Sequence, residues 1–178
     1  IAHHAMSLAI DKACQHGMGC VVVRNSSHFG IAGYYSLMAV ERDAIGITFT
    51  NARPAVAPTH SCEPVLGTNP YAIGIPSDGE FPFLIDCATS VMQRGNFEVL
   101  ERQVDHVEVR DSVTFCENQV DACHPSEVLE QLASGQAALR TIGDHKGYGL
   151  SVAIELFCSA LQSGDYLKQL NGYYEGGP

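Results

Sequence analysis

Apolar positions in the first fifty residues switch between helical spacing and short continuous runs. Residues 2–16 repeat apolar side chains at helical spacing, and Gly17 follows where a helix commonly ends in a left-handed residue. Residues 20–23 (Cys-Val-Val-Val) form a continuous β-favouring run, which predicts a strand buried on both faces. Residues 31–40 predict a second helix and residues 45–50 a second strand. This alternation predicts an α/β architecture with polar loops at the strand ends.

The middle of the chain predicts a β-hairpin. Residues 71–75 and 83–86 have strand character, and the Asp78-Gly79 pair between them is a strong turn signal. Because a hairpin pairs its strands antiparallel, we expect a mixed sheet that is partly antiparallel.

The second half predicts helices separated by a β-favouring stretch. Helices are expected over residues 88–102 and 124–133, with β-favouring residues over 104–115. Residues 147–162 are apolar nearly all round, which predicts a helix buried between layers. No low-complexity tract or evident linker divides the chain.

The charge balance excludes polyanion binding. The 178 residues contain 10 Lys and Arg against 20 Asp and Glu, for a formal net charge of -10. Nucleic acids and anionic membrane surfaces require concentrated cations, so neither is expected as a partner. No apolar run approaches the roughly 18 residues that span a bilayer, and the chain is expected to be soluble.

The cysteines form an odd set of 7 without Cys-x-x-Cys spacing. A chain of this length can build a core without covalent cross-links, so we expect free thiols in a reducing compartment. No group of histidines and cysteines has zinc-site spacing, and no metal is expected.

Two common nucleotide-binding signatures are absent. Gly17 and Gly19 precede the valine-rich run instead of following it, and Val22 occupies the third glycine position of a dinucleotide fingerprint. Residues 143–147 (Gly-Asp-His-Lys-Gly) lack the Walker A order. Neither a Rossmann fold nor a P-loop is expected.

Four polar segments lie at predicted strand or helix ends. The first, Asn25-Ser26-Ser27-His28-Phe29-Gly30, follows the predicted first strand, a position that faces a crevice in α/β folds. His28 is suited to proton transfer near neutral pH. The alternative is that His28 caps the following helix or satisfies a buried carbonyl.

The second and third segments flank the predicted hairpin. Gly67-Thr68-Asn69-Pro70 is a tight turn in which the following proline biases Asn69 to extended geometry. Asp86-Cys87-Ala88-Thr89-Ser90 places a carboxylate and two hydroxyls between a strand and a helix. Thr89 or Ser90 either caps that helix or donates hydrogen bonds to a phosphate or ribose.

The fourth segment surrounds Lys146 with glycines at 143, 147 and 149. Glycines permit close backbone approach to a ligand, and a lysine at a helix start opposes the helix dipole unless an anion offsets it. This local conflict favours a ligand site, and the alternative is a flexible loop with a solvated lysine.

Together the four segments, in their order and approximate spacing, resemble the malate/L-lactate dehydrogenase family of non-Rossmann NAD(P)-dependent oxidoreductases. That family includes sulfolactate, ureidoglycolate and diketogulonate dehydrogenases and a cyclic imine reductase. The resemblance covers most of the chain and is weakest over residues 103–141. It implies a three-layer α/β/α fold with a mixed, partly antiparallel sheet, a nicotinamide cofactor (NAD or NADP), and a homodimer whose active sites involve both subunits.

The resemblance also implies site residues. Contacts to the cofactor are implied for Asp86, Ala88, Thr89, Ser90, His145 and Lys146. A loop beside the substrate or nicotinamide is implied for Asn25, Ser26, Phe29, Gly30, Thr68, Asn69 and Arg53, with His28 as the catalytic acid/base.

The chain also departs from the family pattern. Family members carry an N-terminal Ser-His-Gly motif, followed by arginine and tyrosine, that has no counterpart here, and they continue beyond a position like Pro178. We therefore expect residues 1–178 to be the NAD(P)-binding core of a longer enzyme. The proton donor is then either His28 or a residue of the absent segment, and Arg24 and Arg53 are the cations near these loops.

The resemblance predicts a cytoplasmic enzyme that transfers hydride between nicotinamide and C2 of a small anionic 2-hydroxy or 2-oxo acid of the malate or lactate class. One alternative is a reductase of the same fold that acts on a cyclic imine, a ureido acid or a sugar acid. A second is a non-catalytic dinucleotide-binding or dimerisation fragment. Discrimination between NAD and NADP depends on groups near the ribose 2′ position that the sequence does not place.

Overall fold

The computed structural model describes residues 1–118 and 120–170, which fall into two compact units. Unit 1 comprises residues 1–50, 70–87 and 156–164. Unit 2 comprises residues 51–69 and 88–155 together with the segment that begins at Asp165. Because each unit is assembled from separated stretches of chain, no single linker in the sequence marks the division.

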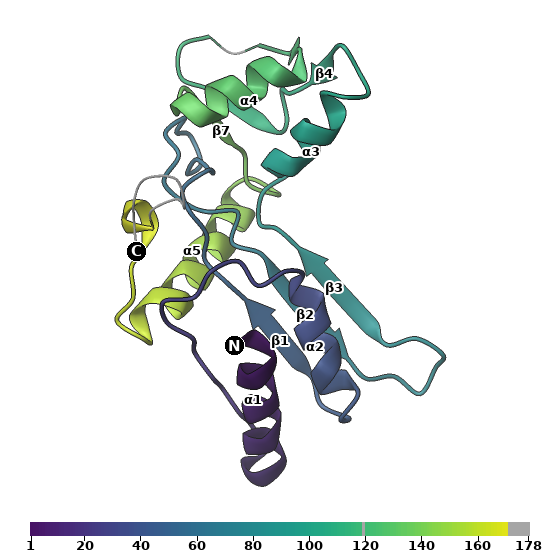
Figure 1. The fold of residues 1–178 in the computed structure, drawn as a ribbon. Coiled ribbons are helices and arrows are strands. Elements are labelled where there is room, and N and C mark those ends of the chain that lie inside the picture. The colour runs from purple at the N-terminus through teal and green to yellow at the C-terminus, as the bar shows by residue number, and fades with distance from the viewer. Residues whose placement is uncertain (119, 171–178) are drawn as a thin grey trace. The chain divides into compact units, whose positions relative to one another are not determined.

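Unit 1 contains a sheet of three antiparallel strands and two helices (Figure 1). The elements are α1 (Ala2–His16), α2 (Ala32–Val40), β1 (Gly46–Phe49), β2 (Tyr71–Ile75) and β3 (Phe83–Cys87), with strand order β1-β2-β3. Gly17, at φ 83°, ends α1 as predicted. The hairpin β2–β3 and both helices are confirmed.

Helix α2 packs closely on the sheet because two of the facing residues are glycines. A Cβ on Gly46 would lie 2.2 Å from the Ser36 carbonyl oxygen, and a Cβ on Gly74 would lie 3.2 Å from the same atom. The buried Ser36 hydroxyl then bonds the Thr48 hydroxyl at 3.0 Å and the Ala72 carbonyl at 3.2 Å. These contacts join α2 to β1 and β2.

The strand predicted over residues 20–23 is wrong. No helix or strand is assigned to residues 18–31, and the Val22 side chain is 39% exposed. β-branched residues favour extended backbone, but a strand also requires a hydrogen-bonded neighbour. Among the described residues, the ladder of this unit is formed by β1, β2 and β3 alone.

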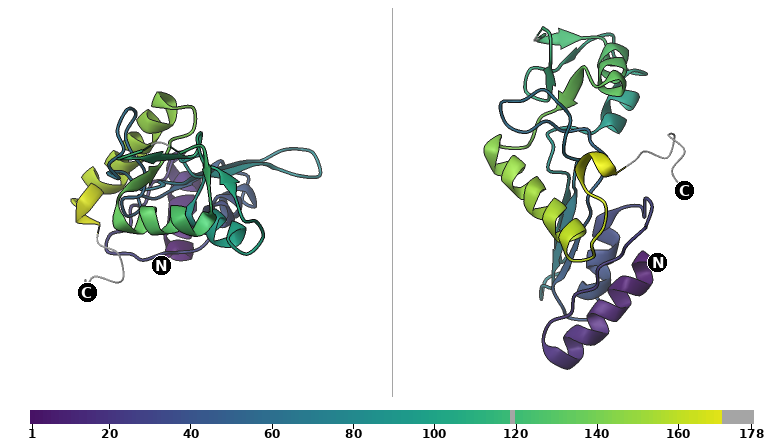
Figure 2. Two further views of the ribbon diagram at one scale, coloured as in Figure 1. Left: turned by 90° about the horizontal axis from the view of Figure 1, so that it is seen from above. Right: turned by 90° about the vertical axis from the view of Figure 1, so that its left-hand side faces the viewer.

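Unit 2 is built around an apolar cluster. Figure 2 shows the helices and strands of this unit in two further views. Its elements are α3 (Arg94–Leu100), β4 (Val107–Glu108), β5 (Val113–Phe115), β6 (Ala122–Cys123), α4 (Pro125–Ser134), β7 (Ala137–Leu139), the start of α5 (His145–Ala160) and the 3₁₀ helix η1 (Leu167–Gln169). Phe97, Val113, Val128 and Leu139 are fully buried in the cluster. Helix α4 begins after His124 and ends at Gly135, as predicted.

The α/β class is confirmed, whereas the mixed sheet is reduced to one isolated contact. The strands of the described residues form three small sheets, β1-β2-β3, β4-β6 and β5-β7, and all their pairs are antiparallel. The parallel contact found among these residues is an isolated bridge between Val56 and Leu139. The three-layer arrangement stays a prediction.

The helix predicted over residues 88–102 begins later than expected. Helix α3 starts at Arg94 and has Gln93 as its N-cap, so neither Thr89 nor Ser90 caps it. Ser90 instead forms an isolated antiparallel bridge with Thr141, and the Val91 amide donates to the Arg140 carbonyl at 2.9 Å. These partners are distant in sequence, so helical periodicity could not reveal them.

Helix α5 is buried on one face only. Ile154 and Ser151 are buried, but Leu156 and Phe157 are 58% and 52% exposed. The helix was predicted to be buried on both faces, and this is wrong for the face that carries Leu156 and Phe157. None of the helices over residues 1–118 and 120–170 is long and apolar enough to cross a membrane.

The expectation that all cysteines are free thiols is wrong for one pair. Cys62 and Cys116, both in unit 2, form a disulfide across a sequence separation of 54. The other cysteines form no disulfide within the described residues, and burial raises the pKa of the Cys123 thiol. Within the described ranges no group of three or more His, Cys, Asp or Glu side chains is arranged to hold a metal ion.

Candidate functional site

The loop that carries His28 lies in unit 1 and is exposed except for a half-buried Phe29. The Gly30 amide donates to His28 Nδ1 at 3.1 Å. With Nδ1 accepting, the neutral imidazole carries its proton on Nε2, which makes Nε2 the nitrogen able to donate. The ring therefore has a local acceptor bond that fixes its tautomer, and it does not bond a buried carbonyl through Nδ1.

The end of this loop is attached to α2 through Tyr35. The Tyr35 hydroxyl donates to the Phe29 carbonyl at 2.6 Å, and the Phe29 and Tyr35 rings meet edge to face at a centroid distance of 5.4 Å. Gly30, at φ 91°, adopts the left-handed backbone that glycine favours. These contacts set the position of His28 relative to the start of α2.

Asp86 caps helix α2 from the neighbouring strand. Its Oδ2 accepts a hydrogen bond from the Gly33 amide at 2.6 Å. This amide lies in the first turn of α2, where a carboxylate also interacts favourably with the helix dipole. A Cβ on Gly33 would lie 2.7 Å from Asp86 Oδ2, so the glycine permits the cap. Asp86 thus links β3 to the helix that follows the His28 loop.

Thr68, Thr89 and Ser90 come together in unit 2. The Thr89 amide and hydroxyl both donate to the Thr68 carbonyl at 2.9 Å, and Thr89 is fully buried. The Thr89 hydroxyl is therefore used within the protein. The Ser90 hydroxyl is buried and has no hydrogen-bond partner, which leaves a donor whose unmet hydrogen bond carries a cost. Ala88, the residue before Thr89, is also buried.

The start of α5 lies beside Ser90. Ser90 and Thr141 form an isolated antiparallel bridge, and the Thr141 hydroxyl donates to the Asp144 carbonyl at 2.7 Å. His145 and Lys146, both exposed, are the first residues of α5. Because helix amides at an N-terminus attract anions, this end of α5 suits a phosphate group, with Lys146 adding a positive charge.

Gly147 allows the chain to turn tightly into α5. A Cβ at this position would lie 2.2 Å from the Ile142 carbonyl oxygen, which itself accepts from the Gly147 amide at 2.9 Å. Gly149, two residues on in the same helix, is open, because a Cβ there would meet no atom within 4 Å. Both glycines therefore lie in the same helix, but only Gly147 is closely packed.

We expect Gly147→Ala to lower the free energy of unfolding by roughly 1–3 kcal/mol, because the added methyl meets fixed backbone atoms. The matched control Gly149→Ala is expected to raise it by up to about 1 kcal/mol, since alanine is the better helix former. Urea unfolding followed by circular dichroism measures both. Equal effects of the two substitutions would contradict the close contact at Gly147.

Asn69 is held in a conformation that its proline neighbour does not predict. Its φ is 33°, so the extended geometry expected before Pro70 is wrong. The side chain is fully buried, and its Oδ1 accepts from the Ala52 amide at 3.0 Å. Its Nδ2 donates to the Ser151 carbonyl at 3.1 Å and to Glu155 Oε2 at 2.9 Å. These buried bonds outweigh the local preference.

Glu155 and Asn51 were missed by the sequence reasoning. Asn51 Nδ2 donates to Glu155 Oε1 at 3.1 Å, and Glu155 lies in the apolar helix α5. The available signal was the glutamate itself, because a carboxylate within an otherwise apolar buried helix requires donors. Arg53, two residues after Asn51, is exposed.

The predicted residues therefore form two groups. The His28 loop (Asn25, Ser26, His28, Phe29 and Gly30) and Asp86 belong to unit 1. The second group, Arg53, Thr68, Asn69, Ala88, Thr89, Ser90, His145 and Lys146, belongs to unit 2. Within unit 2, hydrogen bonds connect Thr68 to Thr89, and the Ser90–Thr141 bridge connects this pair to the start of α5.

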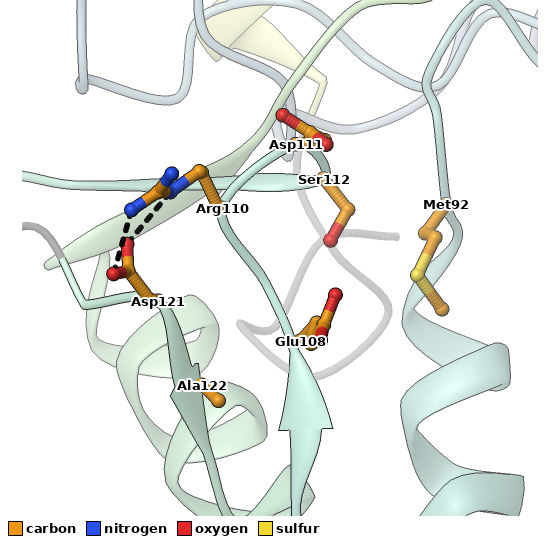
Figure 3. A pocket seen from close by; sticks show the side chains of 7 residues that line it. All are labelled: Met92, Glu108, Arg110, Asp111, Ser112, Asp121 and Ala122. Carbon is orange, nitrogen blue, oxygen red and sulfur yellow. Dashed lines mark hydrogen bonds and ion pairs between the residues drawn. The ribbon is translucent and has the colours of Figure 1, made fainter.

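A separate pocket in unit 2 contains none of the predicted residues (Figure 3). Its volume is about 540 Å³, and it is lined by Met92, Glu108, Arg110, Asp111, Ser112, Asp121 and Ala122. Arg110 donates to both Asp121 oxygens, at 2.8 and 2.7 Å, and these hydrogen bonds lower the pKa of the Asp121 carboxyl. With three carboxylates and one guanidinium, the lining does not suit an anionic substrate.

Comparisons with known proteins extend over the whole chain. Residues 1–178 match the sequence model of a family described as malate/L-lactate dehydrogenase. The malate dehydrogenase of Pyrococcus abyssi is 40% identical over 181 residues, covering 98% of this chain and 48% of that protein. The crystal structure of malate dehydrogenase from Entamoeba histolytica is similar with a TM-score of 0.88 and 45% identity, covering 94% of this chain and 48% of that chain.

A relative with a different named reaction also matches. The Delta(1)-pyrroline-2-carboxylate reductase of Pseudomonas fluorescens is 29% identical over 175 residues, covering 98% of this chain and 49% of that protein. The chain therefore spans about half the length of the curated relatives it matches.

Proposed function

Since the chain belongs to the malate/L-lactate dehydrogenase family, we propose that the complete protein transfers hydride between nicotinamide and C2 of a small 2-hydroxy or 2-oxo acid. The match of all 178 residues to that family carries the proposal. The arrangement of polar groups in unit 2 supports it, because they offer donors for an anionic cofactor.

The cofactor in this proposal is NAD or NADP. The buried, unpartnered Ser90 hydroxyl and the start of α5 with Lys146 fit a ligand that carries hydroxyl and phosphate oxygens. Ala88, Thr89 and His145 adjoin these groups in sequence, and Asp86 lies at the end of β3. When bound, the nicotinamide ring accepts or delivers the hydride.

The residues of this chain handle the proton and the substrate charge. We assign proton transfer to His28, whose Nε2 is left to donate by the Gly30 bond to Nδ1. A guanidinium binds a carboxylate through two parallel hydrogen bonds, and we assign the substrate carboxylate to the exposed Arg53. The proposal includes a small anionic substrate, a three-layer α/β/α homodimer and a cytoplasmic location.

The alternative function is reduction of a cyclic imine by the same hydride chemistry. The similarity to a pyrroline-2-carboxylate reductase favours this candidate over ureido and sugar acids. A cyclic imine acid retains the carboxylate and replaces the C2 carbonyl oxygen with nitrogen, so the same cofactor and cation serve both substrates.

A substrate panel tests the proposal. Oxidation of NADH and of NADPH by the complete protein is followed at 340 nm with oxaloacetate, pyruvate and pyrroline-2-carboxylate. Turnover of a 2-oxo acid is expected. Turnover of the imine alone would replace the first choice with the second. Calorimetric binding of either cofactor without turnover of any substrate would favour a non-catalytic dinucleotide-binding role.

A further inference from the structure

A buried carboxylate in α5 connects several segments of unit 2. Glu155 is 4% exposed, and its two oxygens accept hydrogen bonds from three N–H groups. Oε2 accepts from Asn69, and Oε1 accepts from Asn51 and from the Leu167 amide at 2.9 Å. A buried carboxylate is stable only when such donors replace its hydration.

Two of the three donors to Glu155, Asn51 and Asn69, lie at the two ends of one loop. Asn51 begins the segment 51–69 and Asn69 ends it. Asn69 also accepts a hydrogen bond from the Ala52 amide. The two ends of the loop are therefore joined by this bond and by their shared partner Glu155. Thr68, the residue before Asn69, accepts both hydrogen bonds of Thr89.

The hydrogen-bond directions in this network are determined. Because Asn69 Oδ1 accepts from an amide, its Nδ2 must face Ser151 and Glu155. The group at position 155 must therefore accept toward Asn69, and it must also accept from the Leu167 amide. A carboxylate satisfies both requirements, whereas a neutral amide turns an N–H group toward one of these donors.

We propose that Glu155 is a positioning residue that holds the Thr68–Asn69 turn and the Arg53 segment in the geometry that hydride transfer requires. The expected effect on kcat rests on the proposed function, because it requires that the protein catalyses hydride transfer. Glu155 acts through Asn69 and Asn51, and it has no assigned contact with cofactor or substrate. Its effect is therefore expected on kcat and on the KM of the 2-oxo acid more than on cofactor binding.

Glu155→Gln is expected to lower kcat about 100-fold in the complete protein, since small displacements of positioning groups have effects of this size. The KM for the nicotinamide cofactor is expected to change less than the KM for the 2-oxo acid. Glu130→Gln is the matched control, because Glu130 is exposed on α4, and wild-type kcat is expected there. Retention of wild-type kcat in Glu155→Gln would overturn the proposal.

An exchange of the two side chains separates positioning from general destabilisation. Asn69→Asp alone places two carboxylates against each other and should be as damaging as Glu155→Gln. In the double variant Asn69→Asp/Glu155→Gln, the glutamine donates to the aspartate and still accepts from Leu167, so kcat should recover about tenfold from the single variants. The Ser151 carbonyl then faces an acceptor, which keeps recovery partial. A double variant no better than either single one would overturn the proposal.

Failure of the proposed function is recognised separately. A wild-type protein that turns over none of the substrates disproves the proposed reaction. The positioning role is then decided by hydrogen exchange at the Ala52 amide, whose acceptor is Asn69 Oδ1. Faster exchange in Glu155→Gln that reverses in the double variant supports the network, and unchanged exchange in Glu155→Gln overturns it.

Discussion

Replacing His28 by alanine is expected to lower kcat roughly 10²- to 10⁴-fold, the range over which a positioned acid/base contributes to proton transfer. The His28 ring lies in an exposed loop, where its Nδ1 accepts from Gly30 and its loop is joined to α2 through Tyr35. The imidazole is therefore accessible to a substrate and has a defined tautomer. Steady-state kinetics of the complete protein, with the 2-oxo acid that it turns over best, measures the effect.

A second substitution separates proton transfer from loop geometry. His28→Asn offers a side-chain oxygen that can accept from the Gly30 amide two residues on, but an amide does not move a proton. Loss of kcat in both variants would support acid/base chemistry, whereas activity in His28→Asn would indicate a role in loop geometry alone. His106→Ala is the control, because His106 is exposed and lies outside the candidate residues. A wild-type kcat in His28→Ala would show that another group donates the proton.

The double substitution Cys62→Ala/Cys116→Ala is expected to lower the free energy of unfolding by about 4 kcal/mol. The disulfide closes a loop across a sequence separation of 54, and its removal restores the conformational freedom of that loop in the unfolded chain. Urea unfolding without reductant measures the loss. Addition of dithiothreitol should destabilise the wild type to a similar degree and leave the double variant unchanged.

Cys14→Ala is the matched control for the disulfide, because Cys14 is a free and exposed cysteine. Its effect is expected to lie within about 0.5 kcal/mol of zero. Alkylation of the unfolded protein before reduction, followed by peptide mass spectrometry, should modify Cys14 and leave Cys62 and Cys116 unmodified. Alkylation of Cys62 and Cys116 without reductant would show that the bond is absent.

Several elements were predictable because their signals are local. Helix α1 ends at Gly17, the hairpin β2–β3 surrounds an Asp-Gly pair, and α4 begins after His124 with Pro125 in its first turn. In each case the residues that determine the backbone are neighbours in sequence. Periodicity and turn chemistry are therefore sufficient for these elements.

The predicted site was only partly accessible to the same reasoning. The ordered polar segments identified the family and the candidate residues, including Ser90 and Lys146. The network at Glu155 was missed, although a carboxylate in an apolar helix was a visible signal. The role of Asp86 as the cap of α2 was missed because Gly33, its partner, lies 53 residues away.

The sequence by itself determined the family and the elements with local start and stop signals. Only the tertiary structure decided the later start of α3, the Cys62–Cys116 pair and the Asn69–Glu155 bond. The last two join residues 54 and 86 positions apart. Helix and turn signals act over about four residues, whereas partners at these separations depend on which segments the folded chain brings together.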